Sequence, residues 1–220
     1  MPPTILIALA FAQAANPAVN DWTLVPGLRV GPITASTARA DVDRLFPTGS
    51  VEDDEIELDE GMLQPATFVY RRDPSQTLAI SWNGKGPDAR PRQIFICQGL
   101  RRGTCRWHAA GIAMGARMTA LEALNRGPFT ISGFGYNYGG NVMSWDGGAL
   151  ERLDCNGRLV LTLDGERAGA RYTVPMTPEE VHAVRGDRPI RSSTPAMQKL
   201  NPRVVGMLFQ FPTAQSKHCE

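Results

Sequence analysis

Histidine, cysteine and long apolar runs are scarce in this chain of 220 residues. Its three histidines, His108, His182 and His218, are far apart, and no two cysteines are separated by just two residues. Zinc sites draw on closely spaced cysteines and histidines, so we expect no metal site, and no motif suggests a cofactor. No run approaches the ~20 apolar residues that a membrane-spanning helix needs, so we expect no membrane span.

The chain also lacks a surplus of either charge. Its 23 Lys and Arg residues nearly balance its 22 Asp and Glu residues, which leaves a net charge of +1. Non-specific binding to nucleic acid needs a strong basic surplus on one face, so we expect no nucleic-acid partner. Hydrophobic residues make up 42% and charged residues 20% of the chain. This composition is typical of a globular protein of one large or two small domains.

Motifs of known catalytic sites are missing as well. No G-x-S-x-G segment occurs, and the glycines around Phe134 lack the strand–turn–helix context of a phosphate or dinucleotide loop. Cys105 and His108 are close in sequence and suggest a nucleophile and its base, but a disulfide at Cys105 would abolish that pair. We therefore assign no catalytic residue. An envelope hydrolase or transferase with an unrecognised site remains the alternative function.

The N-terminus has most features of a signal peptide. Ile5 to Phe11 is a short apolar run, and Ala12-Gln13-Ala14 fits the small-x-small cleavage pattern. The basic residues that usually precede the apolar run are absent. A buried N-terminal strand or helix is the alternative, but Asn16-Pro17 would break either. We expect a signal peptide at 1–14, a lead-in tail at 15–23, and a periplasmic or secreted protein.

Four cysteines suit an oxidising compartment. Cys97 and Cys105 flank a polar loop with two glycines, and a disulfide across a short loop is the simplest arrangement there. We predict a Cys97–Cys105 bond. If it forms, Cys155 and Cys219 are left as a possible second disulfide.

Short strands and short helices alternate along the chain. Apolar residues at helical spacing predict short helices at 38–46 and 119–125, and capping patterns predict others beginning at Thr177 and in 192–200. Apolar and alternating runs predict strands at 67–70, 78–82, 93–97, 159–163 and 204–211. The acidic segment 51–61 does not match the EF-hand calcium loop, so we interpret it as a strand with one wet face. We predict an α+β fold with an antiparallel sheet.

Two segments are alike in sequence. Gly27 to Gly31 and Gly111 to Gly115 have the same glycine spacing, and each is followed by a predicted helix and then by strands. We predict a tandem repeat, with units at 24–105 and 106–172 and a C-terminal extension at 173–220 packing on the same domain. Chance similarity between two short glycine segments is the alternative.

The segment 131–150 predicts a β-hairpin rich in aromatic residues. Phe134, Tyr136 and Tyr138 alternate with other residues, Gly139-Gly140 suits a tight turn, and Trp145 lies on the returning strand. Such a stripe packs in a core more often than it binds a ligand. Tyrosine and tryptophan are also favoured in binding surfaces, so these four residues are our candidate binding residues.

Three segments, RVGPITASTARADVDRLF, GFGYNYGGNVMSWDGGAL and SSTPAMQKLNPRV, resemble a group of uncharacterised exported bacterial proteins. The resemblance covers most of the mature chain and implies export but no activity. The repeated helix-then-strands plan is more loosely similar to β-lactamase inhibitor proteins and to small outer-membrane assembly lipoproteins. The lipobox cysteine of the lipoproteins is missing here. We expect an exported, non-catalytic binding or inhibitor-like module whose partner is an unknown protein or cell-envelope component.

Overall fold

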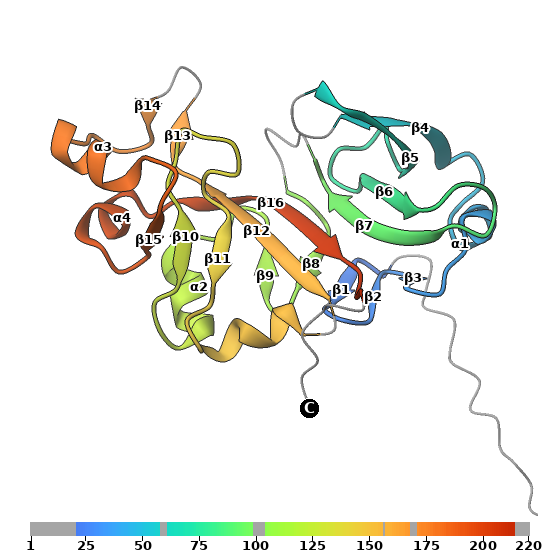
Figure 1. Cartoon of the computed structure of the whole chain (residues 1–220), viewed down its shortest axis with the longest axis horizontal. Coiled ribbons are helices and arrows are strands. Elements are labelled where there is room, and N and C mark those ends of the chain that lie inside the picture. The colour runs from blue at the N-terminus through green and yellow to red at the C-terminus, as the bar shows by residue number, and fades with distance from the viewer. Residues whose placement is uncertain (1–20, 58–60, 99–103, 156, 168–170, 214–220) are drawn as a thin grey trace, which may run out of the picture.

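A six-stranded antiparallel sheet is the framework of the protein (Figure 1). The computed structural model describes residues 21–57, 61–98, 104–155, 157–167 and 171–213. The strands in spatial order are β12 (Arg158–Asp164), β16 (Arg203–Gln210), β7 (Arg90–Ile96), β6 (Leu78–Asn83), β5 (Leu63–Val69) and β4 (Val51–Glu57). The predicted antiparallel α+β fold is confirmed.

Smaller sheets surround this framework. A five-stranded sheet contains β3 (Ile33–Thr34), β2 (Arg29–Val30), β1 (Thr23–Val25), β8 (His108–Ala109) and β9 (Ile112–Ala113). A three-stranded sheet contains β11 (Val142–Ser144), β10 (Thr130–Ser132) and β15 (Pro189–Arg191), and β13 (Glu166–Arg167) pairs with β14 (Arg171–Tyr172).

The helical segments are short. They are the 3₁₀ turn η1 (Arg39–Asp41), α1 (Val42–Leu45), α2 (Met118–Asn125), the 3₁₀ turn η3 (Ala149–Asp154), α3 (Pro178–Val184) and α4 (Pro195–Leu200). All four predicted helices are present. In α3, Thr177 and Glu180 form the expected reciprocal capping box, which satisfies backbone amides at the start of the helix.

The main core lies on one face of the six-stranded sheet. Alternate residues of β12, β16, β7 and β6 point into it, and Met118 and Leu121 of α2 pack there. The opposite face, here called the outer face, carries a small cluster made only of sheet residues: Ile56, Ala66 and Ala79, with Phe68 and Phe95 packed against them. In the described part of the chain, helix residues therefore pack in the main core and not in this cluster.

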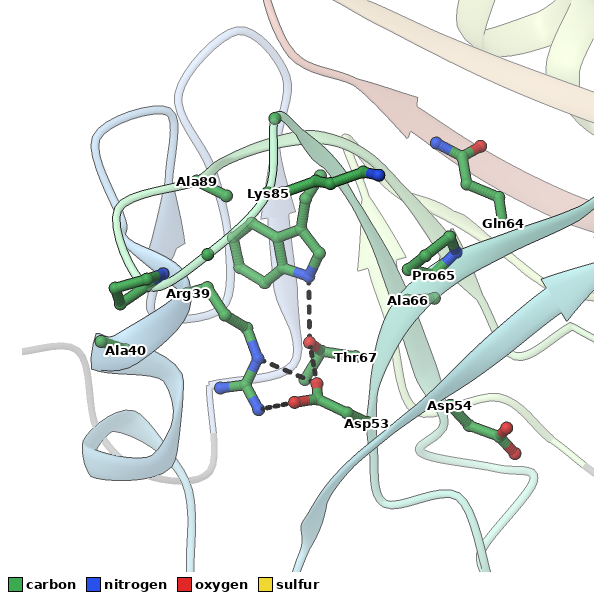
Figure 2. A pocket seen from close by; sticks show the side chains of 14 residues that line it. Arg39, Ala40, Asp53, Asp54, Gln64, Pro65, Ala66, Thr67, Lys85 and Ala89 are labelled. Carbon is green, nitrogen blue, oxygen red and sulfur yellow. Dashed lines mark hydrogen bonds and ion pairs between the residues drawn. The ribbon is translucent and has the colours of Figure 1, made fainter.

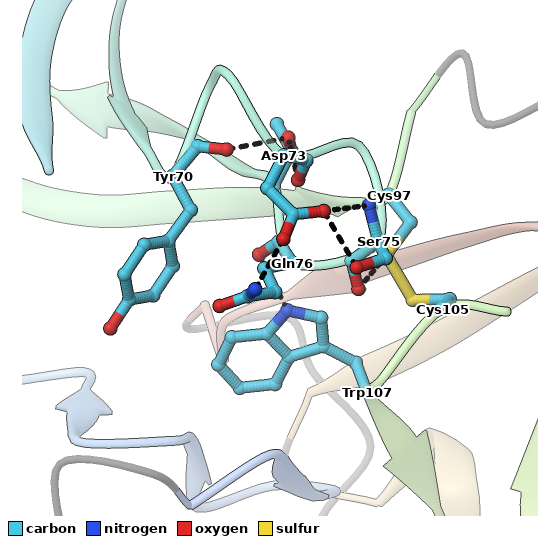
Figure 3. Close-up of a disulfide and its surroundings, with 8 residues drawn as sticks. Tyr70, Asp73, Ser75, Gln76, Cys97, Cys105 and Trp107 are labelled. Carbon is cyan, nitrogen blue, oxygen red and sulfur yellow. Dashed lines mark hydrogen bonds between the residues drawn. A yellow bond between two sulfur atoms is a disulfide. The ribbon is translucent and has the colours of Figure 1, made fainter. Parts of the chain in front are cut away.

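The predicted disulfide between Cys97 and Cys105 is confirmed. The Cα atoms are 6.1 Å apart, and both residues are buried (Figure 3). Cys97 directly follows β7, and Trp107, two residues after Cys105, donates its indole N–H to the carbonyl of Gln76 at 2.8 Å. The bond thus joins the large sheet to the start of β8. Cys155 is also disulfide-bonded; Cys219, its predicted partner, lies outside the described residues, as does the predicted signal peptide.

The two glycine-spaced segments form similar hairpins. β1 pairs with β2 around Gly27, and β8 pairs with β9 around Gly111. β1 and β8 then pair with each other in parallel, with Thr23 opposite His108. The following strands differ, because β4 to β7 form one meander whereas β10 pairs with both β11 and β15 outside the large sheet. The tandem repeat stays a prediction.

The acidic segment forms a strand, β4, as predicted, and the structure places it at the edge of the large sheet. Its side chains are exposed on both faces except for Val51, which is partly buried, and Ile56, which is buried, so the expectation of one wet face is only partly met. The exposed carboxylates belong to an edge, where like charge discourages pairing with another chain. Arg39 and Arg71 form ion pairs with three of them, at Asp53, Glu52 and Asp54.

Candidate functional site

The predicted hairpin exists, but its strands are shorter than expected. β10 and β11 pair antiparallel, with Ile131 opposite Val142, and the loop between them begins after Ser132. Phe134 no longer pairs with β11, because its N–H donates to the carbonyl of Val184, the last residue of α3, at 2.9 Å. The expected Gly139-Gly140 turn is also different, since positive φ occurs at Tyr138 and Gly140 and not at Gly139.

The four candidate aromatic residues consequently divide into two pairs. Phe134 and Trp145 are buried in the main core, with 3% and 1% of their surface exposed. Tyr136 and Tyr138 project from the loop and are 63% and 62% exposed. The expectation that Phe134, Tyr136 and Tyr138 share one strand face is wrong, because the chain is no longer a strand at these positions.

The two tyrosines border a hollow next to the large sheet. Its lining includes Tyr136, Tyr138 and Met143 from the hairpin, and Val160 and Leu208 from β12 and β16. The volume of this hollow, here called the tyrosine hollow, is about 850 Å³. Arg158 and Asp187 contribute charged groups to its lining. The sheet and the hairpin therefore form one partly apolar depression.

An apolar row continues from this hollow across the outer face. Strand register places Val160 opposite Leu208, Leu208 opposite Phe95, Phe95 opposite Ala79, and Ala79 opposite Phe68. Directly opposed residues point to the same face of a sheet, so these five side chains form one lateral row. We call it the apolar row. It connects the tyrosine hollow with the small outer cluster.

A second cavity lies at the other end of the sheet, between β4, β5, η1 and the loop after β6. Its volume is about 790 Å³. Much of its lining is apolar, with Ala40, Pro65, Trp82, Pro87 and Ala89 among the residues (Figure 2). We call it the Trp82 pocket.

A chain of hydrogen bonds fixes the polar side of the Trp82 pocket (Figure 2). The indole N–H of Trp82 donates to Thr67 Oγ1 at 2.9 Å, and that hydroxyl donates to Asp53 Oδ1 at 2.6 Å. Arg39 donates through Nε and NH2 to the two oxygens of Asp53, at 2.9 and 2.5 Å. Such a bidentate, charge-assisted pair fixes both side chains.

Asp53 accepts the hydrogen bonds of both Arg39 and Thr67, and these bonds set the charge state of its carboxyl group. Burial alone would raise the pKa of its carboxyl group, but hydrogen bonds from Arg39 and Thr67 and the charge of Arg39 together hold that pKa below its ordinary value. The carboxylate is therefore ionised at neutral pH. Its side chain is still 62% exposed, so it can accept further hydrogen bonds from a ligand.

The structure argues against the one nucleophile pair found in the sequence. Cys105 forms a disulfide with Cys97, so it has no free thiol that His108 could activate as a nucleophile. His108 in β8 and His182 in α3 are both exposed, and His218 lies outside the described residues. Within the described segments, no group of three or more His, Cys, Asp or Glu side chains is arranged to hold a metal ion.

Comparison with known proteins gives no match to a family model, a curated protein or a solved structure. Among the described residues, none of the helices has the length and apolar composition that crossing a bilayer requires. The geometry of the two cavities and of the outer face is therefore the basis for any functional statement.

Sequence reasoning found the two exposed tyrosines but neither the apolar row nor the Trp82 pocket. The row depends on register across five strands, which no local pattern encodes. The pocket depends on the approach of η1 to the loop after β6, where Arg39 N donates to Ala89 O and Ala40 N to Pro87 O, both at 3.0 Å. From the sequence, Trp82 was predicted only as the end of a strand, and Pro87 only as part of the loop that follows it.

Proposed function

We propose that the protein is an exported, non-catalytic binding module that docks a protein partner on the tyrosine hollow and the apolar row. One observation carries the proposal. Eight large hydrophobic side chains are exposed among the described residues. Three of them, Tyr136, Tyr138 and Met143, line the tyrosine hollow, and a fourth, Val205, lines a second depression that shares Tyr136 with the hollow. Gathered apolar side chains of this kind are typical of interaction surfaces.

The backbone at Tyr138 supports the same proposal. Its φ is +61°, a conformation that costs a residue other than glycine about 1 kcal/mol or more. Much of its side chain faces solvent, so burial in the core offsets little of that cost. Tyrosine combines a large apolar area with a hydroxyl group, which is why it often anchors a partner at the centre of an interface.

The shape of the surface favours a protein over a small molecule. The apolar row crosses five strands and continues into the hollow, so the contact area is long and shallow. Protein partners match long surfaces of this kind, whereas a small ligand fills a single cleft. The Cys97–Cys105 disulfide supports export, because structural disulfides persist in oxidising compartments.

Capture from an envelope extract with matched variants tests the proposal. The wild-type protein and Leu28→Ala should retain the same partner, whereas Tyr136→Ala/Tyr138→Ala should lose it. Leu28 is the matched control because it is 66% exposed and lies away from the hollow, in the β1–β2 turn.

Stability measurements on the same variants complete the test. Both tyrosine substitutions affect exposed side chains, so each should change the free energy of unfolding by no more than ~0.5 kcal/mol. A partner that the tyrosine double variant still captures at the wild-type level would contradict the proposal. So would a large loss of stability in that variant, because the tyrosines would then serve the core.

A further inference from the structure

The Trp82 pocket is separate from the proposed docking surface. Its lining comes from β4, β5, η1 and the loop after β6, and it shares no residue with the tyrosine hollow. The backbone bonds from Arg39 and Ala40 to the loop, and the side-chain chain from Trp82 to Arg39, hold it in shape without a ligand. A preformed cleft of this size is typical of small-ligand sites.

The charges in the pocket compensate one another. Arg39 forms ion pairs with Asp43 and Asp53, so its charge is matched within the protein. Asp54 forms an ion pair with Arg71, and Figure 2 shows its carboxylate pointing away from Asp53, Thr67 and Arg39. Lys85 is exposed at the pocket. The lining holds two acidic residues, Asp53 and Asp54, and two basic residues, Arg39 and Lys85, so neither charge is in excess, which favours a neutral ligand over an ion.

The indole of Trp82 can contact a ligand through its ring face but not through its N–H group. The N–H already donates to Thr67, and the ring is only half-buried. A proline-rich peptide on an aromatic groove would use the indole N–H as a donor to one of its carbonyl groups, and the N–H of Trp82 is already engaged by Thr67. A ligand that stacks on the ring without requiring a donor from it fits better.

Polar groups beside the ring can both donate and accept hydrogen bonds. Asp53 presents an exposed carboxylate, and Lys85 and the remaining N–H groups of Arg39 are donors. A purely apolar ring would leave the remaining hydrogen-bonding capacity of these groups unused. Sugar hydroxyls donate and accept equally well, and the C–H face of a sugar ring is apolar.

We propose that the Trp82 pocket binds a neutral saccharide, with one sugar ring stacked on Trp82 and its hydroxyls bonded to Asp53, Arg39 and Lys85. Pro65 and Pro87 supply the rest of the apolar lining. This site does not depend on the proposed protein docking, since the two surfaces have no residue in common.

Isothermal titration calorimetry with maltotriose, cellotriose and chitotriose tests the proposal on the full chain. At least one trisaccharide should bind to a single site with a Kd at or below ~1 mM. Trp82→Ala should weaken that binding at least about tenfold, and Lys85→Ala should weaken it less. Tyr136→Ala is the control on the other surface and should leave the affinity unchanged.

A second variant keeps the test decisive if Trp82→Ala fails to fold. Ala40 is exposed and lines the pocket, so Ala40→Trp should fill the space without disturbing the core and should abolish binding. Three results would overturn the proposal: no trisaccharide binds, the bound one is unaffected by Ala40→Trp, or a proline-rich decapeptide binds the pocket and the saccharides do not. None of these results bears on capture of a protein partner by Tyr136 and Tyr138.

Discussion

Gly140 marks the point where the hairpin loop touches the large sheet. Its φ is +80°, and its carbonyl accepts a hydrogen bond from the N–H of Leu163 in β12 at 2.8 Å. A Cβ atom at this position would lie 1.9 Å from the carbonyl oxygen of Leu163. The position therefore needs glycine for two reasons, the backbone conformation and the close approach of another strand.

Gly147 provides a matched control, because its φ is +77° and a Cβ atom there would have no neighbour within 4 Å. Gly147→Ala should cost only the conformational penalty, ~1 kcal/mol. Gly140→Ala should cost ~1–3 kcal/mol more, because the loop must move away from β12. Urea unfolding of both variants measures the difference, and equal losses would show that the contact with Leu163 relaxes freely.

Residue-scale expectations succeeded where a local pattern determines the outcome. The capping box at Thr177, the bond between Cys97 and Cys105 and the turn-forming role of Gly140 were all predictable from neighbours in sequence. The burial of Phe134 and Trp145 and the exposure of Tyr136 and Tyr138 were not. Phe134, for example, pairs with Arg185 after α3, which is a long-range contact that no local pattern describes.

At the scale of elements, the Cys97–Cys105 disulfide connects two sheets that share no strand. It lies between the end of β7 and the start of β8, and both sulfur-bearing side chains are buried. Short helices and short strands have few local contacts of their own, so a covalent link between sheets limits how far they can separate.

Cys97→Ala/Cys105→Ala should lower the free energy of unfolding by ~2–4 kcal/mol, mainly because the unfolded chain gains freedom. Alanine avoids placing a polar hydroxyl in the buried space. Urea unfolding without reductant isolates this bond, since Cys155 remains disulfide-bonded in the variant. An unchanged unfolding midpoint would mean that the bond contributes nothing to stability.

The boundaries of several elements were predictable from composition and spacing, but those of the hairpin at β10 and β11 and the strand partners were not. The helix expected at 119–125 is observed as α2 at Met118–Asn125, and the strand expected at 204–211 as β16 at Arg203–Gln210. By contrast, nothing near β10 indicates that it pairs with β15 as well as β11. Pairing over such separations is set by the whole core, which local patterns do not describe.

Across the whole molecule, the pKa shifts of the carboxyl groups have one direction. Among the described residues, six carboxyl groups have a clearly shifted pKa, and in each the pKa is lowered: Asp21, Asp53, Asp54, Asp73, Glu179 and Glu180. Hydrogen bonds to the ionised form contribute in every case. At Glu180, for example, the main cause is the hydrogen bond from Lys199.

Stability should therefore fall on acidification. A carboxyl whose pKa is lower in the folded state stabilises the protein above its unfolded pKa of ~4, and this contribution disappears as the pH falls through the folded pKa. Urea midpoints should be lower at about pH 3 than at about pH 5. A midpoint that stays constant or rises over this range would show that these interactions do not favour the folded state.

β16 determines when the protein can fold during its own synthesis. The strand consists of residues 203–210, yet it lies between β12 and β7 in the large sheet (Figure 1). Until the ribosome has released this segment, β7 has only β6 as a neighbour and the main core lacks Val204, Met207 and Phe209. A nascent chain cannot complete its sheet from the N-terminus onwards, because the six-stranded sheet stays divided until residues 203–210 have been synthesised.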